Sequence, residues 1–437
     1  MAAIALENNE VLVRLQPREK LAGLLGDLRF PLASVKQVDV VADAFDAVRG
    51  FRAPGLAIPG RTRIGTWRRR SGKLFAVARR GEPAVRMELA GEAFSTVVVC
   101  VEDPAGIAEQ VRLAADLPLA PQFTEEEVRF QSGGLGLAGS WMRPEGRTLG
   151  VALILPGSGE IDRNADHRRI PLGISRDLAR SLAARGIASL RYDKRGTGSS
   201  GGTFLSAGFA QNTDDATAAL RWTSQRAGGL PVFLVGHSEG SYHAAALAAE
   251  QEVPLAGAVL LSASAHSGFE TARWQTAQIS RTLPAFPRML LKLLRQDLAK
   301  LQAKSVAKIQ ATTGDVARMQ GRRMNALWWR EFLDFDPMPY LRRIQVLVLA
   351  ATGTKDLQVD PADLDLIAVT VPGPVTTHRL EDLSHLLRRD PAGPSMSDYK
   401  RQVREPVDAE LLDLVSGWIG RQAEAEAPAG TPSSSLA

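Results

Sequence analysis

The chain has 437 residues, which is too long for one ordinary domain, so two domains are expected. About 45% of the residues are hydrophobic, and the net charge of +5 is spread over scattered arginines, which argues against a nucleic-acid partner. The one cysteine, Cys100, excludes an internal disulfide, and its apolar surroundings predict a buried side chain. No secretory signal or membrane-length apolar run is visible, so a cytoplasmic location is expected.

Residues 1–115 carry short β-like runs separated by turn signals, and an amphipathic helix is expected to follow them at 104–113. The expected strands are residues 10–15, 35–41, 75–78, 85–89 and 96–101. Several strands followed by one helix is the order of a small barrel or sandwich capped by a helix. The segments Phe51-Arg-Ala-Pro-Gly55, Arg61-Thr-Arg-Ile-Gly65 and Phe75-Ala-Val-Ala-Arg-Arg-Gly81 resemble the PH-like domains found in bacteria. This resemblance implies a small, mainly β, PH-like domain.

Arginines gather in the same region, at Arg61, Arg63, Arg68, Arg69 and Arg70. One interpretation is a patch that makes weak contact with anionic lipid or phosphate. The other is a solvated hairpin face without a ligand. Both interpretations stay open at this point.

A linker is expected at 116–124, and the pattern changes in the domain expected over 125–420. A hairpin around Gly133-Gly134 leads in, and apolar strands then alternate with helices. The expected strands are 149–155, 188–192, 232–235, 258–261, 346–350 and 375–380, and the expected helices are 173–185, 214–225, 242–250, 363–369 and 409–419. Such alternation indicates an α/β fold whose mostly parallel sheet is covered on both faces.

The alternation stops between residues 265 and 340, where roughly 75 residues carry no predicted strand, too many for a plain loop. Apolar residues recur at helical spacing over 290–301. A helical cap insert over the active-site mouth is therefore expected at 265–340. Residues 421–437 end in a run rich in Ala, Glu, Pro and Ser, and a disordered tail is expected there.

The chemistry centres on Gly236-His237-Ser238-Glu239-Gly240, which follows an apolar strand and precedes an alanine-rich helix. A strand, a sharp turn with glycines on both sides of a serine, and a helix together form a nucleophile elbow. The elbow and the lead-in hairpin narrow the fold to the α/β-hydrolase architecture. Ser238 is the predicted nucleophile.

A serine hydroxyl needs a base, and the base needs a group that orients it. In this architecture the partners follow in the order Ser, acid, His. Asp356, after the strand at 346–350, is the predicted acid, with Asp360 as the alternative. His385 is the predicted base, because His378 lies inside a strand-like run and the other histidines come before the acid.

Acyl transfer also needs donors aimed at the developing oxyanion. One expected donor is the backbone N–H of Glu239, directly after the nucleophile. The second is expected from the loop Pro156-Gly-Ser-Gly159, through the N–H of Ser158 or, as the alternative, of Gly157.

The runs Leu155-Pro-Gly-Ser-Gly159, Tyr192-Asp-Lys-Arg-Gly-Thr-Gly-Ser199 and Gly236-His-Ser-Glu-Gly240 resemble bacterial serine hydrolases of the α/β-hydrolase superfamily. The resemblance lies near the prolyl-oligopeptidase-like and dienelactone-hydrolase-like groups, which are mostly known as carboxylesterases. It implies that Ser238, Asp356 and His385 match the family triad. It also implies a supporting loop beside the site, formed by Asp193, Arg195, Asp162 and Arg163.

Two further motifs resemble a dinucleotide-binding site and a metal site, but their surroundings do not fit either one. Gly196-Thr-Gly-Ser-Ser-Gly201 matches a dinucleotide fingerprint, but no helix opens directly after it. Asp162, Asp166 and His167 have a spacing that suits no regular metal site. No cofactor and no metal are therefore expected.

The sequence thus predicts a serine hydrolase that cleaves small-molecule carboxylic esters through an acyl-enzyme. Thioesterase and peptidase activity are alternatives within the same fold. A lipid-recruited binding protein that keeps the hydrolase fold as a scaffold is the alternative from another class. The sequence does not indicate the oligomeric state.

Overall fold

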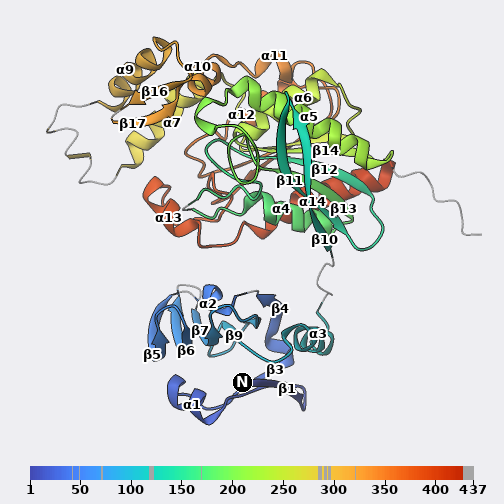
Figure 1. Ribbon diagram of the computed structural model, residues 1–437, viewed down its shortest axis with the longest axis vertical. Helices are drawn as coiled ribbons and strands as arrows, with labels where there is room; N and C mark the ends of the chain where they lie inside the picture. Colours follow the sequence, from blue (N-terminus) through green and yellow to red (C-terminus); the bar gives the residue numbers. More distant parts are fainter. Residues whose placement is uncertain are drawn as a thin grey trace, which may run out of the picture. The chain divides into compact units, whose positions relative to one another are not determined.

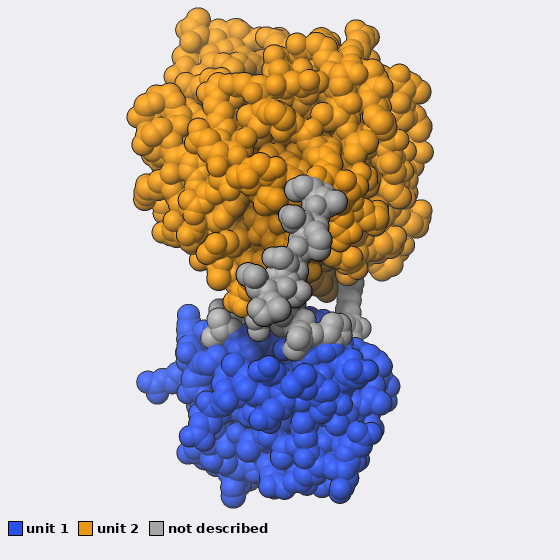
Figure 2. Space-filling model, turned by 90° about the vertical axis from the view of Figure 1, so that its right-hand side faces the viewer, with its two compact units in different colours: residues 1–120 blue, residues 121–437 orange. Residues whose placement is uncertain are grey.

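The structure is a computed structural model that describes residues 1–426 apart from 42, 49, 70–71, 118–122, 169, 284–287, 290–292, 294–296 and 320. The chain forms two compact units, residues 1–120 and 121–437 (Figure 2). The linker expected at 116–124 stays a prediction, because most of it lies outside the described residues. Within the described part of the chain, no helix combines the length and the apolar character that crossing a membrane requires.

The first unit is mainly β, as predicted (Figure 1). One sheet has the order β1-β2-β3 and the other the order β4-β8-β9-β7-β6-β5. The strands are β1 (Ala3–Glu7), β2 (Glu10–Arg14), β3 (Leu28–Pro31), β4 (Val35–Val41), β5 (Phe51–Ile58), β6 (Thr62–Arg69), β7 (Gly72–Arg79), β8 (Ala84–Leu89) and β9 (Thr96–Val99), with helices α1 (Pro17–Gly23), α2 (Ala44–Ala47) and α3 (Pro104–Ala114). The sequence pattern missed β1, β3, β5 and β6. In β5, the turn signal Pro54-Gly55 lies inside the strand, where the register with β6 shifts.

The arginines of this unit differ in what they contact. The guanidinium of Arg63 lies 3.8 Å from the ring centre of Phe45 and donates to the carbonyl of the same residue at 2.8 Å. Arg69 donates to the Thr96 hydroxyl, so both side chains bind within the unit. Arg61 and Arg68 are exposed, and Arg70 lies outside the described residues. An anionic-lipid patch and a PH-like identity both stay predictions.

The second unit is built on one eight-stranded sheet in the order β10-β11-β13-β12-β14-β15-β18-β19 (Figure 1). Its strands are β10 (Phe123–Ser132), β11 (Leu135–Pro144), β12 (Gly150–Leu155), β13 (Ile187–Tyr192), β14 (Val232–His237), β15 (Gly257–Leu261), β18 (Leu347–Gly353) and β19 (Val375–Leu380). The hairpin β10–β11 is antiparallel, and the pairs from β13 to β19 are parallel. This sheet confirms the predicted α/β-hydrolase architecture.

Helices cover both faces of the sheet, which explains the continuous apolar strands. Along β12, Leu153 and Leu155 pack with the helices of one face, and Ala152 and Ile154 pack with those of the other. The first face carries α5 (Phe209–Ala227), α6 (Glu239–Glu250) and α12 (Asp363–Thr370), and the second carries α4 (Ile174–Ala183) and α14 (Ala409–Glu426). A short helix α13 (Tyr399–Gln402) precedes α14.

The insert between β15 and β18 is not purely helical, so the prediction of a strand-free cap is wrong. It contains α7 (Gly268–Thr282), α9 (Leu298–Gln310), a hairpin of β16 (Val316–Met319) and β17 (Arg322–Asn325), α10 (Ala326–Asp334) and α11 (Met338–Leu341). The helical spacing noted over 290–301 falls partly outside the described residues, and α9 covers its end. Asp297 is extended, and its side chain accepts the N–H groups of Ala299 and Lys300, so it caps the start of α9. Residues 290–292 and 294–296 lie outside the described residues.

Aromatic side chains connect the insert to the sheet's helices. Phe332 of α10 stacks on Trp328 at 4.8 Å, and Phe335 lies 4.8 Å from Phe209 of α5. Tyr242 of α6 contacts both Phe209 and Phe332. This cluster gives the insert an apolar contact with α5 and α6.

The disordered tail was predicted to begin at 421, but α14 continues to Glu426. Ala423 is fully buried with the core of the second face, and that burial extends the helix beyond the composition change. Residues 427–437 lie outside the described residues.

The elbow between β14 and α6 brings backbone segments into close contact. Ser238 has φ 55° and ψ −119°, a strained conformation for a residue with a side chain. A Cβ at Gly236 would lie 2.2 Å from the carbonyl oxygen of Gly240, and a Cβ at Gly240 would lie 2.1 Å from that of Leu155 on β12. Glycine is required at both positions because backbone atoms fill the space of a side chain.

We expect Gly240→Ala to destabilise the second unit by about 1–3 kcal/mol, because the methyl group must push α6 away from β12. Urea unfolding followed by tryptophan fluorescence measures this, since all seven tryptophans except Trp67 lie in residues 121–437. Gly393→Ala is the control, because no atom lies within 4 Å of its Cβ position. Equal stability of the two variants would contradict the close-approach explanation.

Candidate active site

The structure brings Ser238, His385 and Asp356 together at one edge of the sheet. Ser238 follows β14, Asp356 follows β18 and His385 follows β19, and parallel strands end at the same edge. The Ser238 Oγ lies 3.0 Å from the His385 Nε2. The His385 Nδ1 lies 2.8 Å and 3.0 Å from the two carboxylate oxygens of Asp356. Each nitrogen of the ring therefore has the partner that nucleophilic catalysis needs.

Asp356 is buried and well supplied with donors. Its Oδ1 accepts the N–H of Gln358 at 2.7 Å and of Val359 at 3.0 Å. Burial would raise the pKa of this carboxyl, but the His385 ring and these hydrogen bonds outweigh burial and lower its pKa. The alternative acid, Asp360, instead accepts the N–H of Ala362. The charged carboxylate that faces the imidazole is that of Asp356.

The His385 loop is held from the elbow side by His237. The His237 Nε2 lies 3.0 Å from the backbone oxygen of His385, to which its N–H donates. Burial, and secondly the nearby His385 ring, lower the pKa of His237 to about 3. His237 is therefore neutral near pH 7 and acts as a fixed hydrogen-bond donor. On the far side, the Ser384 hydroxyl donates to Gln402 at 2.6 Å.

The predicted oxyanion donors come from two segments beside Ser238. Glu239 is the first residue of α6, where a backbone N–H has no acceptor within the helix. Gly157 is buried, and a Cβ there would lie 3.4 Å from the Ser238 Cβ. Ser158 follows it as an exposed residue. The roles of Glu239, Ser158 and Gly157 as donors stay predictions.

The predicted supporting loop splits into separate contacts. Arg163 donates to both oxygens of Asp193, from its backbone N–H and Nη2 at 2.8 Å each. Burial would raise the pKa of Asp193, but Arg163 outweighs it and the pKa is lowered. Arg195 contacts Asp215 on α5 rather than Asp193. Asp162 accepts the backbone N–H groups of Asn164 and Asp166 and so shapes its own turn.

Sequence reasoning missed Lys194, between the predicted Asp193 and Arg195. Its side chain is buried, and its Nζ lies 3.0 Å from the Glu239 Oε1. The sequence offers one signal, a lysine two residues after a buried strand. It does not show which of the three adjacent charged side chains turn inward, because the chain leaves the strand's alternation there.

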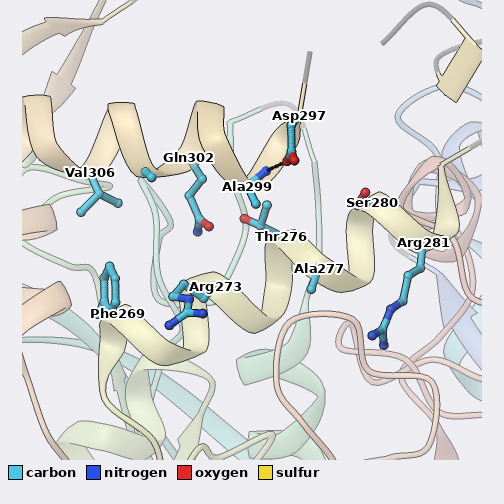
Figure 3. Close-up of a pocket in the computed structure, with 11 residues that line it drawn as sticks. Phe269, Arg273, Thr276, Ala277, Ser280, Arg281, Asp297, Ala299, Gln302 and Val306 are labelled. Atoms are coloured by element: carbon cyan, nitrogen blue, oxygen red, sulfur yellow. Dashed lines mark hydrogen bonds between the residues drawn. The ribbon is translucent and has the colours of Figure 1, made fainter. Parts of the chain in front are cut away.

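A separate hollow of about 420 Å³ lies between α7 and α9 of the insert (Figure 3). Phe269 and Arg273 of α7 line one side, and Gln302 and Val306 of α9 line the other. The Gln302 side chain donates to the backbone of Ala272 across the gap. None of the residues that line this hollow belongs to the Ser238 site.

Replacing His237 tests its buried, neutral state through the pH dependence of stability. In the unfolded chain the His237 ring takes up a proton below pH 6.5, whereas in the folded protein the same ring does so only near pH 3. The contribution of the neutral His237 ring to the free energy of unfolding is therefore complete above pH 6.5 and is lost as the pH falls toward 3. Between pH 7.5 and 5.0 we expect the wild type to lose about 2 kcal/mol more than His237→Gln. Urea unfolding at the two pH values measures this; equal losses would contradict a neutral His237.

Known proteins are similar in sequence to parts of this chain. The human Protein ABHD12B is 32% identical over 150 residues, which are 34% of this chain and 38% of that protein. The chain thus spans well under half the length of this relative. Esterase EstD of Thermotoga maritima is 24% identical over 301 residues, 68% of each protein.

Solved structures match about two thirds of this chain at low identity. Est1E from Butyrivibrio proteoclasticus with bound ferulic acid is 15% identical with a TM-score of 0.46, covering 68% of this chain and 99% of its own. A proline iminopeptidase of Mycobacterium smegmatis is 16% identical with a TM-score of 0.47, covering 69% and 99%.

The family model described as "Serine aminopeptidase, S33" matches residues 172–392, which is just over half of the chain. The match includes the elbow and the loops that carry Asp356 and His385. The chain therefore belongs to the serine aminopeptidase S33 family of α/β hydrolases.

Proposed function

We propose that this protein is a serine esterase that cleaves small carboxylic esters through an acyl-enzyme on Ser238. The observation that carries the proposal is the continuous contact from Ser238 Oγ to His385 Nε2 at 3.0 Å and from His385 Nδ1 to Asp356 at 2.8 Å. A serine hydroxyl alone is a poor nucleophile, and this arrangement supplies both a base and the group that orients the base.

In the first half of the reaction, the Ser238 Oγ attacks the ester carbonyl while its proton moves to the His385 Nε2. The carbonyl π pair becomes the oxyanion of a tetrahedral intermediate. When that intermediate collapses, the C–O bond to the alcohol breaks, and His385 protonates the departing oxygen. The lowered pKa of Asp356 keeps this carboxylate charged, so it stabilises the imidazolium in between.

In the second half, His385 takes a proton from water, which attacks the acyl carbon. The bond to Ser238 breaks, the serine regains its proton, and the carboxylic acid leaves. In both halves the oxyanion is assigned to the N–H groups of Glu239 and Ser158, with Gly157 as the alternative. Support for this assignment comes from the free N–H at the start of α6 and from the packing of Gly157 against Ser238.

An ester is favoured over an amide or thioester because a relative that matches 68% of the chain is named an esterase. Peptidase activity is the second candidate, since the family's description names an aminopeptidase. The same three residues serve either bond, and the leaving group decides the rate. A lipid-recruited scaffold without catalysis is the remaining alternative.

We expect Ser238→Ala to lower kcat/KM for p-nitrophenyl acetate by about 10⁴-fold or more, and Asp356→Asn by about 10³–10⁴-fold. Serine removal deletes the nucleophile, whereas the asparagine cannot stabilise an imidazolium. Steady-state assays on the full chain measure both. A fluorophosphonate probe should label the wild type and leave Ser238→Ala unlabelled.

Ser305→Ala on the surface of α9 is the matched control and should behave as wild type. Parallel assays with thioesters and aminoacyl amides separate the hydrolase alternatives by kcat/KM. Undiminished ester hydrolysis by Ser238→Ala would rule out the proposal, and a wild-type protein that the probe does not label would favour the scaffold alternative.

A further inference from the structure

A buried ion pair lies directly behind the elbow, between Lys194 and Glu239. The two side chains are 6% and 1% exposed, and the ammonium nitrogen lies 3.0 Å from the Glu239 Oε1. The same oxygen accepts the side-chain N–H of Asn212 at 3.0 Å and contacts the His243 Nε2 at 3.2 Å. Burial would raise the pKa of Glu239, but the Lys194 charge, together with His243, lowers it to about 2. Glu239 is therefore a carboxylate at neutral pH.

Lys194 makes a second contact, with the other segment beside the nucleophile. Its Nζ lies 3.3 Å from the backbone oxygen of Gly157. Gly157 in turn packs against the Ser238 Cβ. One ammonium group thus joins the residue that follows the nucleophile to the loop that follows β12.

The geometry of the peptide bond gives this contact a direction. The oxygen of Gly157 and the N–H of Ser158 belong to one planar trans peptide, so they point in opposite directions. A cation that holds the oxygen also fixes where the N–H points. It further polarises the peptide, which makes the N–H a stronger donor.

We propose that Lys194 is a positioning residue for the oxyanion site. It holds the oxygen of the Gly157–Ser158 peptide and the side chain of Glu239, so that the backbone N–H groups of Ser158 and Glu239 converge on the reacting carbonyl oxygen. The inference rests on the proposed function, because it concerns the tetrahedral intermediate on Ser238. It adds a residue that does not touch the substrate and acts through two backbone donors.

A purely structural role of Lys194 is the competing explanation. The two roles differ in whether Lys194 affects the stability of the fold or the stability of the charged intermediate. A buried ion pair contributes little net stability compared with apolar residues of the same volume. A structural pair would affect unfolding and would leave the balance between substrate and transition-state binding unchanged. A positioning residue acts mainly on the charged intermediate, because uniform binding does not raise kcat.

The test compares wild type with Lys194→Met, which keeps much of the side-chain volume and removes the charge. We expect kcat for p-nitrophenyl acetate to fall about 10- to 100-fold with KM nearly unchanged. This is less than the about 10²–10³-fold loss of a whole donor, because the N–H is still present. An alkyl trifluoromethyl ketone, which forms a tetrahedral adduct on a nucleophilic serine, should lose affinity by the same factor as kcat/KM.

Lys194→Met leaves the Glu239 carboxylate short of one partner and so lowers stability. The double variant Lys194→Met/Glu239→Gln removes both charges and should recover much of the lost stability. Positioning predicts that its ketone affinity stays low, because the Gly157 oxygen still lacks its ammonium. Activity that recovers together with stability would overturn the inference.

Arg191→Met is the matched control, because Arg191 is a buried cation on β13 that contacts Glu125 and Asn164 instead. It should lower stability and leave ketone affinity and kcat near wild type. If the wild type shows no Ser238-dependent turnover, the proposed function fails and this inference fails with it. If the wild type turns over and Lys194→Met binds the ketone as tightly, only the inference is overturned.

Discussion

The close approach of α6 to β12 is the constraint on which the site depends. Gly240 lies so near the Leu155 carbonyl that no side chain fits between them, and the chain turns from strand to helix within one residue. That turn forces Ser238 into its strained backbone conformation. The strain directs the hydroxyl away from the sheet and brings the start of α6, with its free N–H groups, beside the hydroxyl. The proposed nucleophile and the proposed oxyanion donor of α6 therefore come from one packing contact.

Three buried carboxylates around the elbow each face a partner side chain, which offsets the cost of burying a charge. Asp356 faces His385, Asp193 faces Arg163 and Glu239 faces Lys194. In each pair the carboxylate keeps a lowered pKa although burial alone would raise it. The two partners of each pair come from segments that follow different strands, so each pair also joins two segments at this edge of the sheet. The same contacts therefore hold the site in place and compensate its buried carboxylates.

The sequence predicted those parts of the fold that local physics determines. Burial on both faces leaves continuous apolar strands, and the elbow needs two glycines around one serine, so both features are visible in a single chain. The hairpin of β16 and β17 was missed because its strands carry Arg318, Arg322 and Arg323 without an alternating apolar face. The inward turn of Lys194 was missed because it depends on Glu239, which lies far along the chain.

The predicted acid, Asp356, is a second feature that depends on the folded chain. Asp356 and Asp360 lie in one loop, and nothing in their spacing distinguishes them. Asp356 faces His385 because two backbone N–H groups hold its carboxylate in the turn, whereas Asp360 accepts an N–H just before α12. Only the folded loop decides between them. The order of strands brings the loop to the site, and the local turn selects the residue.

The insert lies between two strands that are neighbours in the sheet. The insert leaves the sheet after β15 and returns at β18, yet these two strands pair directly, with Gly257 opposite Leu347 and Leu261 opposite Ala351. Its length and shape therefore do not enter the register that brings Ser238, Asp356 and His385 together. Its aromatic contact with α5 and α6 is made through Phe335 and Phe332, which reach Phe209 and Tyr242. A change in the length of the insert can therefore leave the pairing of β15 with β18 unaltered.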